Sequence, residues 1–192
     1  MISFGPIEQF SIKECSLSEL AKNIIKEVNI KEIDKPIAIE IKEIKGCPIE
    51  GNGGHWGGER GNSTWYPDRE FKPKNPLTNS ESLTWGEILD KYGIDGIPFK
   101  NGEPDFSEIS KGTVEINNFT ENRYGKGGNF DQACEKLAEQ KGYTKEEVKE
   151  WMKENNYTWH ECNDCKTMQK VPTEVHGNIR HSGGISEVKS NQ

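Results

Sequence analysis

The sequence has 192 residues, of which 31% are hydrophobic and 30% are charged, and its mean hydropathy is −0.88. Such a chain can form one ordinary domain, or a catalytic domain with a smaller companion, around a core of limited size. The formal net charge of −7 argues against a protein that coats nucleic acid by bulk electrostatics. It leaves room for an enzyme that meets one phosphate through a bound metal.

Targeting signals and disulfides are not evident in the sequence. No apolar run approaches the roughly 18 residues of a membrane-spanning helix, so we expect no membrane segment. The N-terminus lacks a basic start followed by an apolar stretch, so we expect a soluble protein without a classical signal peptide. The five cysteines are an odd number, which favours incidental thiols in a reducing environment over a disulfide scaffold.

The first 45 residues are predicted to form a helix followed by a strand. Apolar residues recur at helical spacing over residues 16–33, and Pro36 ends the pattern. Residues 37–42 then alternate between isoleucine and other residues, which indicates a strand with one buried face. We assign no function to residues 1–45.

Residues 46–128 are rich in glycine and proline and are predicted to be poor in strands. Six glycines lie between residues 51 and 61, together with His55 and Trp56. Glycine-rich turns that carry aromatic rings are typical of an ordered loop packed on a sheet. A short helix is expected over residues 83–93, ended by Gly93, and the segment 96–128 reads as extended pieces joined by glycines.

Two helices are predicted at the start of the last third, residues 129–192. Apolar spacing indicates a helix over residues 129–142, with Asn129 as the N-cap and Gly142 as the stop. Thr144 and Glu147 have the spacing of a capping box, which opens a helix that buries Val148, Trp151 and Met152.

A β-hairpin over residues 157–172 is predicted next, with Asn-Asp-Cys at its turn and Pro172 at its end. Thr173 is a suitable N-cap for a short helix over residues 174–181. On the first strand Trp159 is expected to face the core, which turns its neighbour His160 outward toward a cleft.

Three of the four histidines fall in this hairpin and helix, namely His160, His176 and His181. A neutral histidine accepts a proton near working pH, and a divalent cation neutralises charge on a scissile phosphate. The cluster therefore predicts phosphodiester hydrolysis with one metal and one base. The five-residue separation of His176 and His181 is about 140° on an ideal helix. Both can face one ion only if the helix ends near Arg180.

These residues carry a resemblance to a known family. Trp159-His160-Glu161, followed by residues 166–184, resembles the WHH-type nuclease toxins of the HNH/endonuclease VII superfamily. Residues 54–73 and 96–109 are similar to segments that precede such cores in bacterial polymorphic toxins. The resemblance covers residues 45–188 and implies an α+β fold with a C-terminal ββα-metal (His-Me finger) core. We therefore expect an accessory region over 46–128 and the nuclease core over 129–192.

The resemblance also implies roles for individual residues. His160 matches the strand histidine and is favoured as general base, while Glu161 stands where many members have a second histidine. Either His160 is the base and Glu161 a ligand, or His160 binds the metal and Glu161 takes the proton. His176 and His181 match the metal ligands, for one divalent metal ion (Mg²⁺, Mn²⁺, Ni²⁺ or Zn²⁺).

Two further residues are candidates for substrate binding. Arg180 either stabilises phosphate charge or is a solvated cation at a helix end. Gln169 points either at the site or at solvent.

The resemblance implies a DNase toxin, delivered into the cytoplasm of a target cell and neutralised by an immunity protein. One alternative is an RNase on the same fold. Another is a non-catalytic interaction module stabilised by zinc, bound through Cys162, Cys165, His160 and His176.

Overall fold

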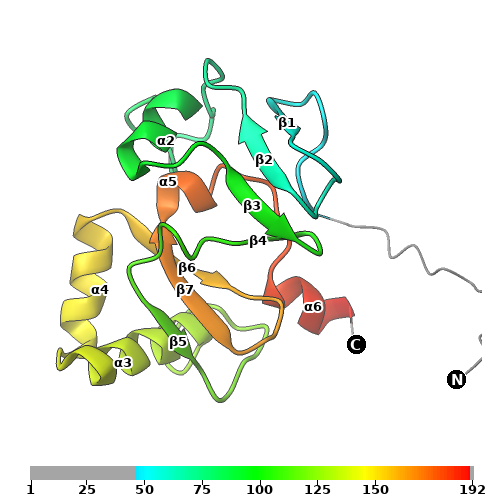
Figure 1. The fold of residues 1–192 in the computed structure, drawn as a ribbon. Coiled ribbons are helices and arrows are strands. Elements are labelled where there is room, and N and C mark those ends of the chain that lie inside the picture. Colours follow the sequence, from blue (N-terminus) through cyan, green and yellow to red (C-terminus); the bar gives the residue numbers. More distant parts are fainter. Residues whose placement is uncertain (1–45, 191–192) are drawn as a thin grey trace, which may run out of the picture. The chain divides into compact units, whose positions relative to one another are not determined.

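The computed structural model describes residues 46–190 and has the expected α+β architecture (Figure 1). The helix predicted over residues 16–33 and the strand over residues 37–42 lie outside the described residues. The described chain contains two small antiparallel sheets, and its buried hydrophobic residues form two clusters.

The first sheet comes from the glycine-rich region and has the strand order β1-β2-β3-β4. Its strands are β1 (Gly54–Trp56), β2 (Thr64–Pro67), β3 (Ile97–Lys100) and β4 (Glu103–Pro104). With β5 (Thr113–Glu115), residues 46–128 therefore hold five strands of two to four residues and are richer in strands than expected. The reason is that this region supplies buried tryptophans to neighbouring strands, Trp56 on β1 and Trp65 on β2.

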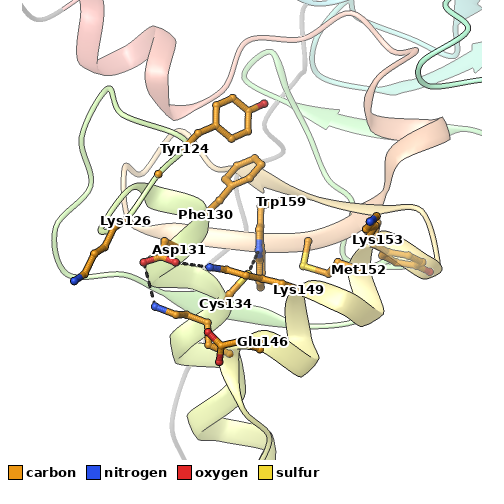
Figure 2. A pocket seen from close by; sticks show the side chains of 13 residues that line it. Tyr124, Lys126, Phe130, Asp131, Cys134, Glu146, Lys149, Met152, Lys153 and Trp159 are labelled. Atoms are coloured by element: carbon orange, nitrogen blue, oxygen red, sulfur yellow. Dashed lines mark hydrogen bonds and ion pairs between the residues drawn. The ribbon is translucent and has the colours of Figure 1, made fainter.

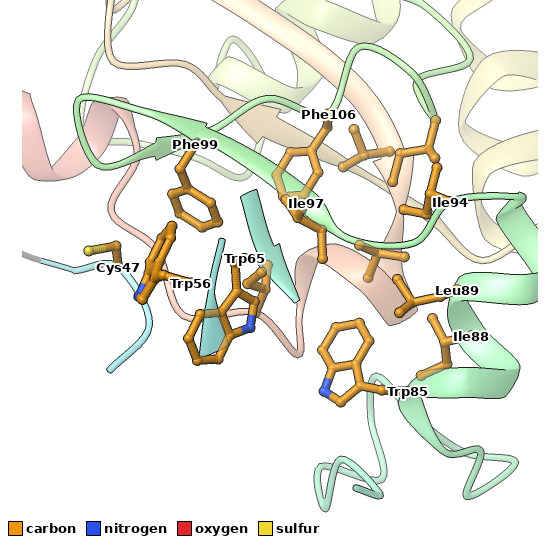
Figure 3. Close-up of a cluster of buried hydrophobic side chains, with 14 residues drawn as sticks. Cys47, Trp56, Trp65, Trp85, Ile88, Leu89, Ile94, Ile97, Phe99 and Phe106 are labelled. Atoms are coloured by element: carbon orange, nitrogen blue, oxygen red, sulfur yellow. The ribbon is translucent and has the colours of Figure 1, made fainter. Parts of the chain in front are cut away.

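Aromatic rings pack between this sheet and helix α2 (Trp85–Tyr92), as Figure 3 shows. The ring of Trp56 lies 5.2 Å from that of Trp65 and 5.0 Å from that of Phe99, in edge-on contacts. Helix α2 lies within the predicted range and ends at Gly93, whose φ of 68° is left-handed. Its start is fixed by a capping box of Thr84 and Glu87.

The second sheet has the order β5-β7-β6 and contains the predicted hairpin. Strands β6 (Tyr157–Glu161) and β7 (Thr167–Pro172) pair antiparallel, which confirms the hairpin, and β6 is an outer strand. Strand β5 pairs with the other edge of β7, so residues on both sides of the expected boundary at residue 128 form one sheet.

Helices α3 (Asn129–Lys141) and α4 (Lys145–Glu154) pack on the face of this sheet that Trp159 and Met168 occupy. The capping box of Thr144 and the left-handed Gly142 are confirmed. Two expectations were wrong here. The N-cap of α3 is Gly128, because the Asn129 side chain is engaged elsewhere, and Trp151 is 38% exposed and packs its ring against Lys170 instead of entering the core.

The hairpin is followed by a shorter helix than predicted. Helix α5 (Thr173–His176) has Pro172 at its N-cap position, because the Thr173 amide already donates to the carbonyl of Asn156. It ends at Gly177, well before residue 181, because the Asn178 side chain donates to the free carbonyl of Glu174. A separate helix, α6 (Gly184–Ser190), follows.

Candidate metal centre

The three C-terminal histidines converge on one point from different elements. His160 lies on β6, His176 ends α5, and His181 lies in the segment between α5 and α6. Nδ1 of His160 is 3.3 Å from Nε2 of His176, and Nε2 of His181 is 3.1 Å from that same His176 nitrogen. The early end of α5 makes this possible, since His181 is free of the helix and turns back toward His176.

These separations fit a shared metal ion. Zinc–nitrogen bonds of about 2.0–2.1 Å place two tetrahedral nitrogen ligands roughly 3.3 Å apart. One nitrogen from each of the three histidines lies within 4.8 Å of the other two. Since a ring nitrogen carries one lone pair or one proton, His176 Nε2 cannot satisfy both neighbours by hydrogen bonding alone. The donor set therefore fits a divalent cation that accepts all three lone pairs.

The protonation of the rings also suits metal binding. The Nδ1–H of His181 donates to the carbonyl of Ile179 at 3.0 Å, which leaves the Nε2 lone pair aimed at His176. Burial, with the neighbouring imidazoles, holds the pKa of His176 well below its ordinary value and lowers the pKa of His181 to about 4. Both rings are therefore neutral at physiological pH, the form that ligates metals.

One buried ring supports all three imidazoles. The centroid of the Phe106 ring lies 5.0 Å from the His160 ring, 5.7 Å from that of His176 and 5.9 Å from that of His181. Phe106 is 1% exposed. The histidines are therefore held by apolar packing from a loop far earlier in the chain.

The outer nitrogen of His160 faces a carboxylate. His160 Nε2 is buried without a hydrogen-bond partner and lies 3.6 Å from Oε1 of Glu103. That oxygen accepts a hydrogen bond from the backbone N–H of Asn163 at 2.7 Å. A carboxylate behind a ligating imidazole fixes the ring orientation in many metal sites. His160 points away from Trp159 as expected, and although its side chain is only 1% exposed it lines a pocket together with His176 and His181.

The Glu161 side chain lies near the histidines although it leaves β6 on the opposite face from His160. Its Oε1 accepts the Asn129 amide at 2.8 Å, and its Oε2 accepts Nε and a terminal nitrogen of Arg123 at 2.8 and 2.6 Å. Successive strand residues face opposite ways. Both His160 and Glu161 still line one pocket, because β6 is an outer strand and the pocket lies at its free edge.

This pocket has a volume of about 260 Å³. Its walls require a close approach of the chain at Gly183, where a Cβ atom would lie 2.7 Å from the carbonyl oxygen of Glu161. The lining residues are Arg123, His160, Glu161, His176, His181, Gly183, Ile185 and Ser186.

The two residues expected to bind substrate are placed differently. Arg180 is exposed and does not line the pocket. Gln169 stands opposite His160 in the hairpin register, on the same face of the sheet, but it also lies outside the lining.

Of the two cysteines of the hairpin turn, Cys162 lies near His160 and Cys165 is grouped with none of the three histidines. Among the described residues, Cys162 groups with Glu103 and His160, while Cys165 belongs to neither of the possible metal clusters. Burial raises the pKa of the Cys162 thiol well above its ordinary value, which disfavours the thiolate that zinc requires. This geometry does not favour a four-ligand zinc module.

Sequence reasoning missed four residues that build the site: Glu103, Phe106, Arg123 and Asn129. Asn129 and Arg123 hold Glu161, while Phe106 and Glu103 contact His160. Arg123 carried a weak signal, because it and Arg180 are the only arginines after Arg69.

The chain is similar to a known protein family. Residues 96–183, a little under half of the chain, match the family described as the DNase/tRNase domain of colicin-like bacteriocin. The match includes all three histidines and supports a nuclease toxin domain with hydrolase activity on nucleic acid. No curated protein is significantly similar to the chain. In the described part of the chain, no helix is long and apolar enough to cross a membrane.

Proposed function

We propose that the chain is a metal-dependent endonuclease toxin with a His-Me finger core of the HNH/WHH type. The observation that carries the proposal is the convergence of three imidazole nitrogens, with separations of 3.1 and 3.3 Å around His176. Of the two assignments that the sequence leaves open, this geometry favours His160 as the third metal ligand beside His176 and His181.

A divalent cation bound there supplies Lewis-acid stabilisation of the charge that develops on the scissile phosphate and its leaving oxygen. Glu161 is then the proton acceptor for the attacking water. Each of its oxygens already accepts a bond from Asn129 or Arg123, yet a carboxylate has about four lone-pair sites. Those two contacts fix the carboxylate, and they leave it able to accept one more proton donor from the pocket.

Arg123 has a second role in this proposal. Its side chain is 41% exposed and lines the pocket while it pairs with Glu161. A guanidinium presents five donors, so it can hold Glu161 and still contact a phosphate oxygen. We assign substrate contact to Arg123, since Arg180 and Gln169 lie outside the pocket lining.

DNA is the favoured substrate, acted on in a target cell after delivery, with a cognate immunity protein as the neutralising partner. RNA is the second candidate, because the description of the matched family includes tRNases. The net charge of −7 favours neither polymer, and the distinction rests on experiment.

The test is cleavage by the purified full chain. Supercoiled plasmid and total RNA are each incubated with the protein in Mg²⁺, Mn²⁺, Ni²⁺ or Zn²⁺, with EDTA as the blank. We expect plasmid nicking that His176→Ala and Glu161→Gln abolish, while Arg180→Gln, which removes an exposed charge outside the pocket, cuts like the wild type. Cleavage that persists in His176→Ala, or in EDTA, contradicts the metal-dependent mechanism.

A further inference from the structure

A second pocket is lined by residues of α3, α4 and β6 (Figure 2). On β6 it is lined by Trp159, which points away from His160. It has a volume of about 670 Å³. Its lining includes the rings of Phe130 and Trp159 and the thioether of Met152, so its floor is apolar. Nothing in the proposed reaction uses this pocket.

The rim of the pocket is positively charged, although the chain as a whole carries −7. Four lysines line it against two carboxylates, and two of the lysines share the carboxylate of Asp131, at 2.6 and 3.2 Å. A local excess of positive charge over an apolar floor is complementary to a nucleotide, which joins a flat ring to a phosphate. The lysines are Lys126, Lys145, Lys149 and Lys153.

An aromatic ring stands at the edge of this pocket. Tyr124 is 73% exposed, and its ring meets that of Phe130 edge-on at a centroid distance of 5.3 Å. Most of the tyrosine ring is therefore available to a planar partner. Exposed aromatic rings in basic grooves are the platforms on which proteins stack unpaired bases.

The two pockets are neighbours along the chain. Arg123 lines the histidine pocket, and Tyr124, the next residue, lines the lysine-rimmed one. Likewise Glu161 and Trp159 are two residues apart on one face of β6, about 7 Å along the strand. A stacked strand advances about 3.4 Å per nucleotide and an unstacked strand advances further, so one or two nucleotides cover that distance.

We propose that this pocket binds an unpaired nucleotide of the substrate strand, with its base against Tyr124 and its backbone along the lysines. The inference rests on the proposed function and narrows its substrate to nucleic acid that is single-stranded beside the cleavage point. Bases inside a duplex are stacked on one another and present no free face to a side chain. The site tolerates any base, because every base has a π-face.

The experiment measures binding by the full chain in EDTA, where no cleavage interferes. The probe is a short fluorescein-labelled single-stranded oligonucleotide, compared by anisotropy with the duplex of the same sequence. Tyr124→Ala should weaken binding of the single strand about tenfold, the effect expected for loss of one stacking platform. Lys126→Gln should lower the slope of log K against log salt by about 0.7, the value for one phosphate contact on a single strand.

Two matched variants serve as controls. Tyr143→Ala removes a tyrosine that is 63% exposed, and Lys136→Gln removes a lysine of α3; both residues lie outside the lining of this pocket. Both controls should bind like the wild type, and the duplex should bind more weakly and ignore Tyr124→Ala.

The proposal is overturned if the duplex binds as tightly as the single strand, or if Tyr124→Ala and Tyr143→Ala behave alike. Failure of the wild type to bind any oligonucleotide would also overturn it. Plasmid and RNA cleavage with added metal test the catalytic proposal separately. If the protein cleaves nucleic acid but Tyr124→Ala and Lys126→Gln bind the oligonucleotide like the wild type, only the proposed nucleotide pocket is refuted.

Discussion

Replacement of Phe106 by leucine tests whether apolar packing positions the three histidines. The ring is 1% exposed and touches all three imidazoles at centroid distances of 5.0–5.9 Å. Loss of buried ring carbons, with the small cavity left behind, should lower the free energy of unfolding by about 1–2 kcal/mol. For a chain of this size that corresponds to a fall in Tm of roughly 2–8 °C.

The informative comparison is with Phe99→Leu. Phe99 is 5% exposed and packs edge-on against Trp56 in the same hydrophobic cluster as Phe106. Both variants should therefore lose similar stability. Only Phe106→Leu should also weaken metal binding, by about tenfold, the lower end of the effect of residues that support metal ligands.

The assay pairs thermal unfolding with calorimetric titration of Ni²⁺ or Zn²⁺ into each protein. Equal metal affinity in the wild type and Phe106→Leu would refute the claim that this ring positions the three imidazoles for metal binding. Equal weakening in both variants would refute it as well, because the effect would then follow general destabilisation of the cluster.

Three other changes have expected outcomes. Gly183→Ala should reduce metal affinity and activity about tenfold or more, because the new Cβ would lie 2.7 Å from the Glu161 carbonyl oxygen and displace the segment that carries His181. Calorimetry measures the metal affinity and plasmid nicking measures the activity. Wild-type values in both assays would contradict this prediction. Arg123→Gln should cost about 2 kcal/mol in urea unfolding, because the 3%-exposed carboxylate of Glu161 loses its charged partner, and an unchanged midpoint would argue against this pair. The backbone N–H of Gly127 and the neighbouring lysines hold the pKa of the Asp131 carboxyl well below its ordinary value. The ionised carboxylate therefore stabilises the fold fully above the unfolded pKa of about 3.9, and this stabilisation is lost as the pH falls through the folded pKa. The stability difference between wild type and Asp131→Asn should therefore shrink from pH 6 to about pH 2, and a constant difference would refute the linkage.

Local chemistry was sufficient to predict the elements whose ends depend on nearby residues. The capping box at Thr144 and the left-handed stops at Gly93 and Gly142 need only three or four neighbouring residues, and the structure confirms them. Asn129 fails the same reasoning, because its amide bonds to Glu161 on a strand much later in the chain. The end of α5 also depends on a distant partner, since Asn178 bonds to Thr78 as well as to the helix.

The candidate site was foreseeable only in part for the same reason. The spacing of His160, His176 and His181 signals a shared ion, because all three belong to one short stretch. The burial of His160 was not foreseeable, since its partners Glu103, on β4, and Phe106, in the loop after it, lie far earlier in the chain. Nothing in the local pattern around those two residues marks them as partners of a histidine.

The small volume of the histidine pocket has a consequence for what the enzyme can distinguish. In the proposed reaction, a pocket of about 260 Å³ lined by imidazoles, a carboxylate and a guanidinium receives a phosphodiester group and leaves little room for a base pair. The side chains that line this pocket can contact phosphate oxygens and their negative charge, which are the same in every nucleotide of the polymer. Cleavage at such a site should therefore not depend on the base sequence. Any preference among substrates should reflect which segments of the polymer are accessible.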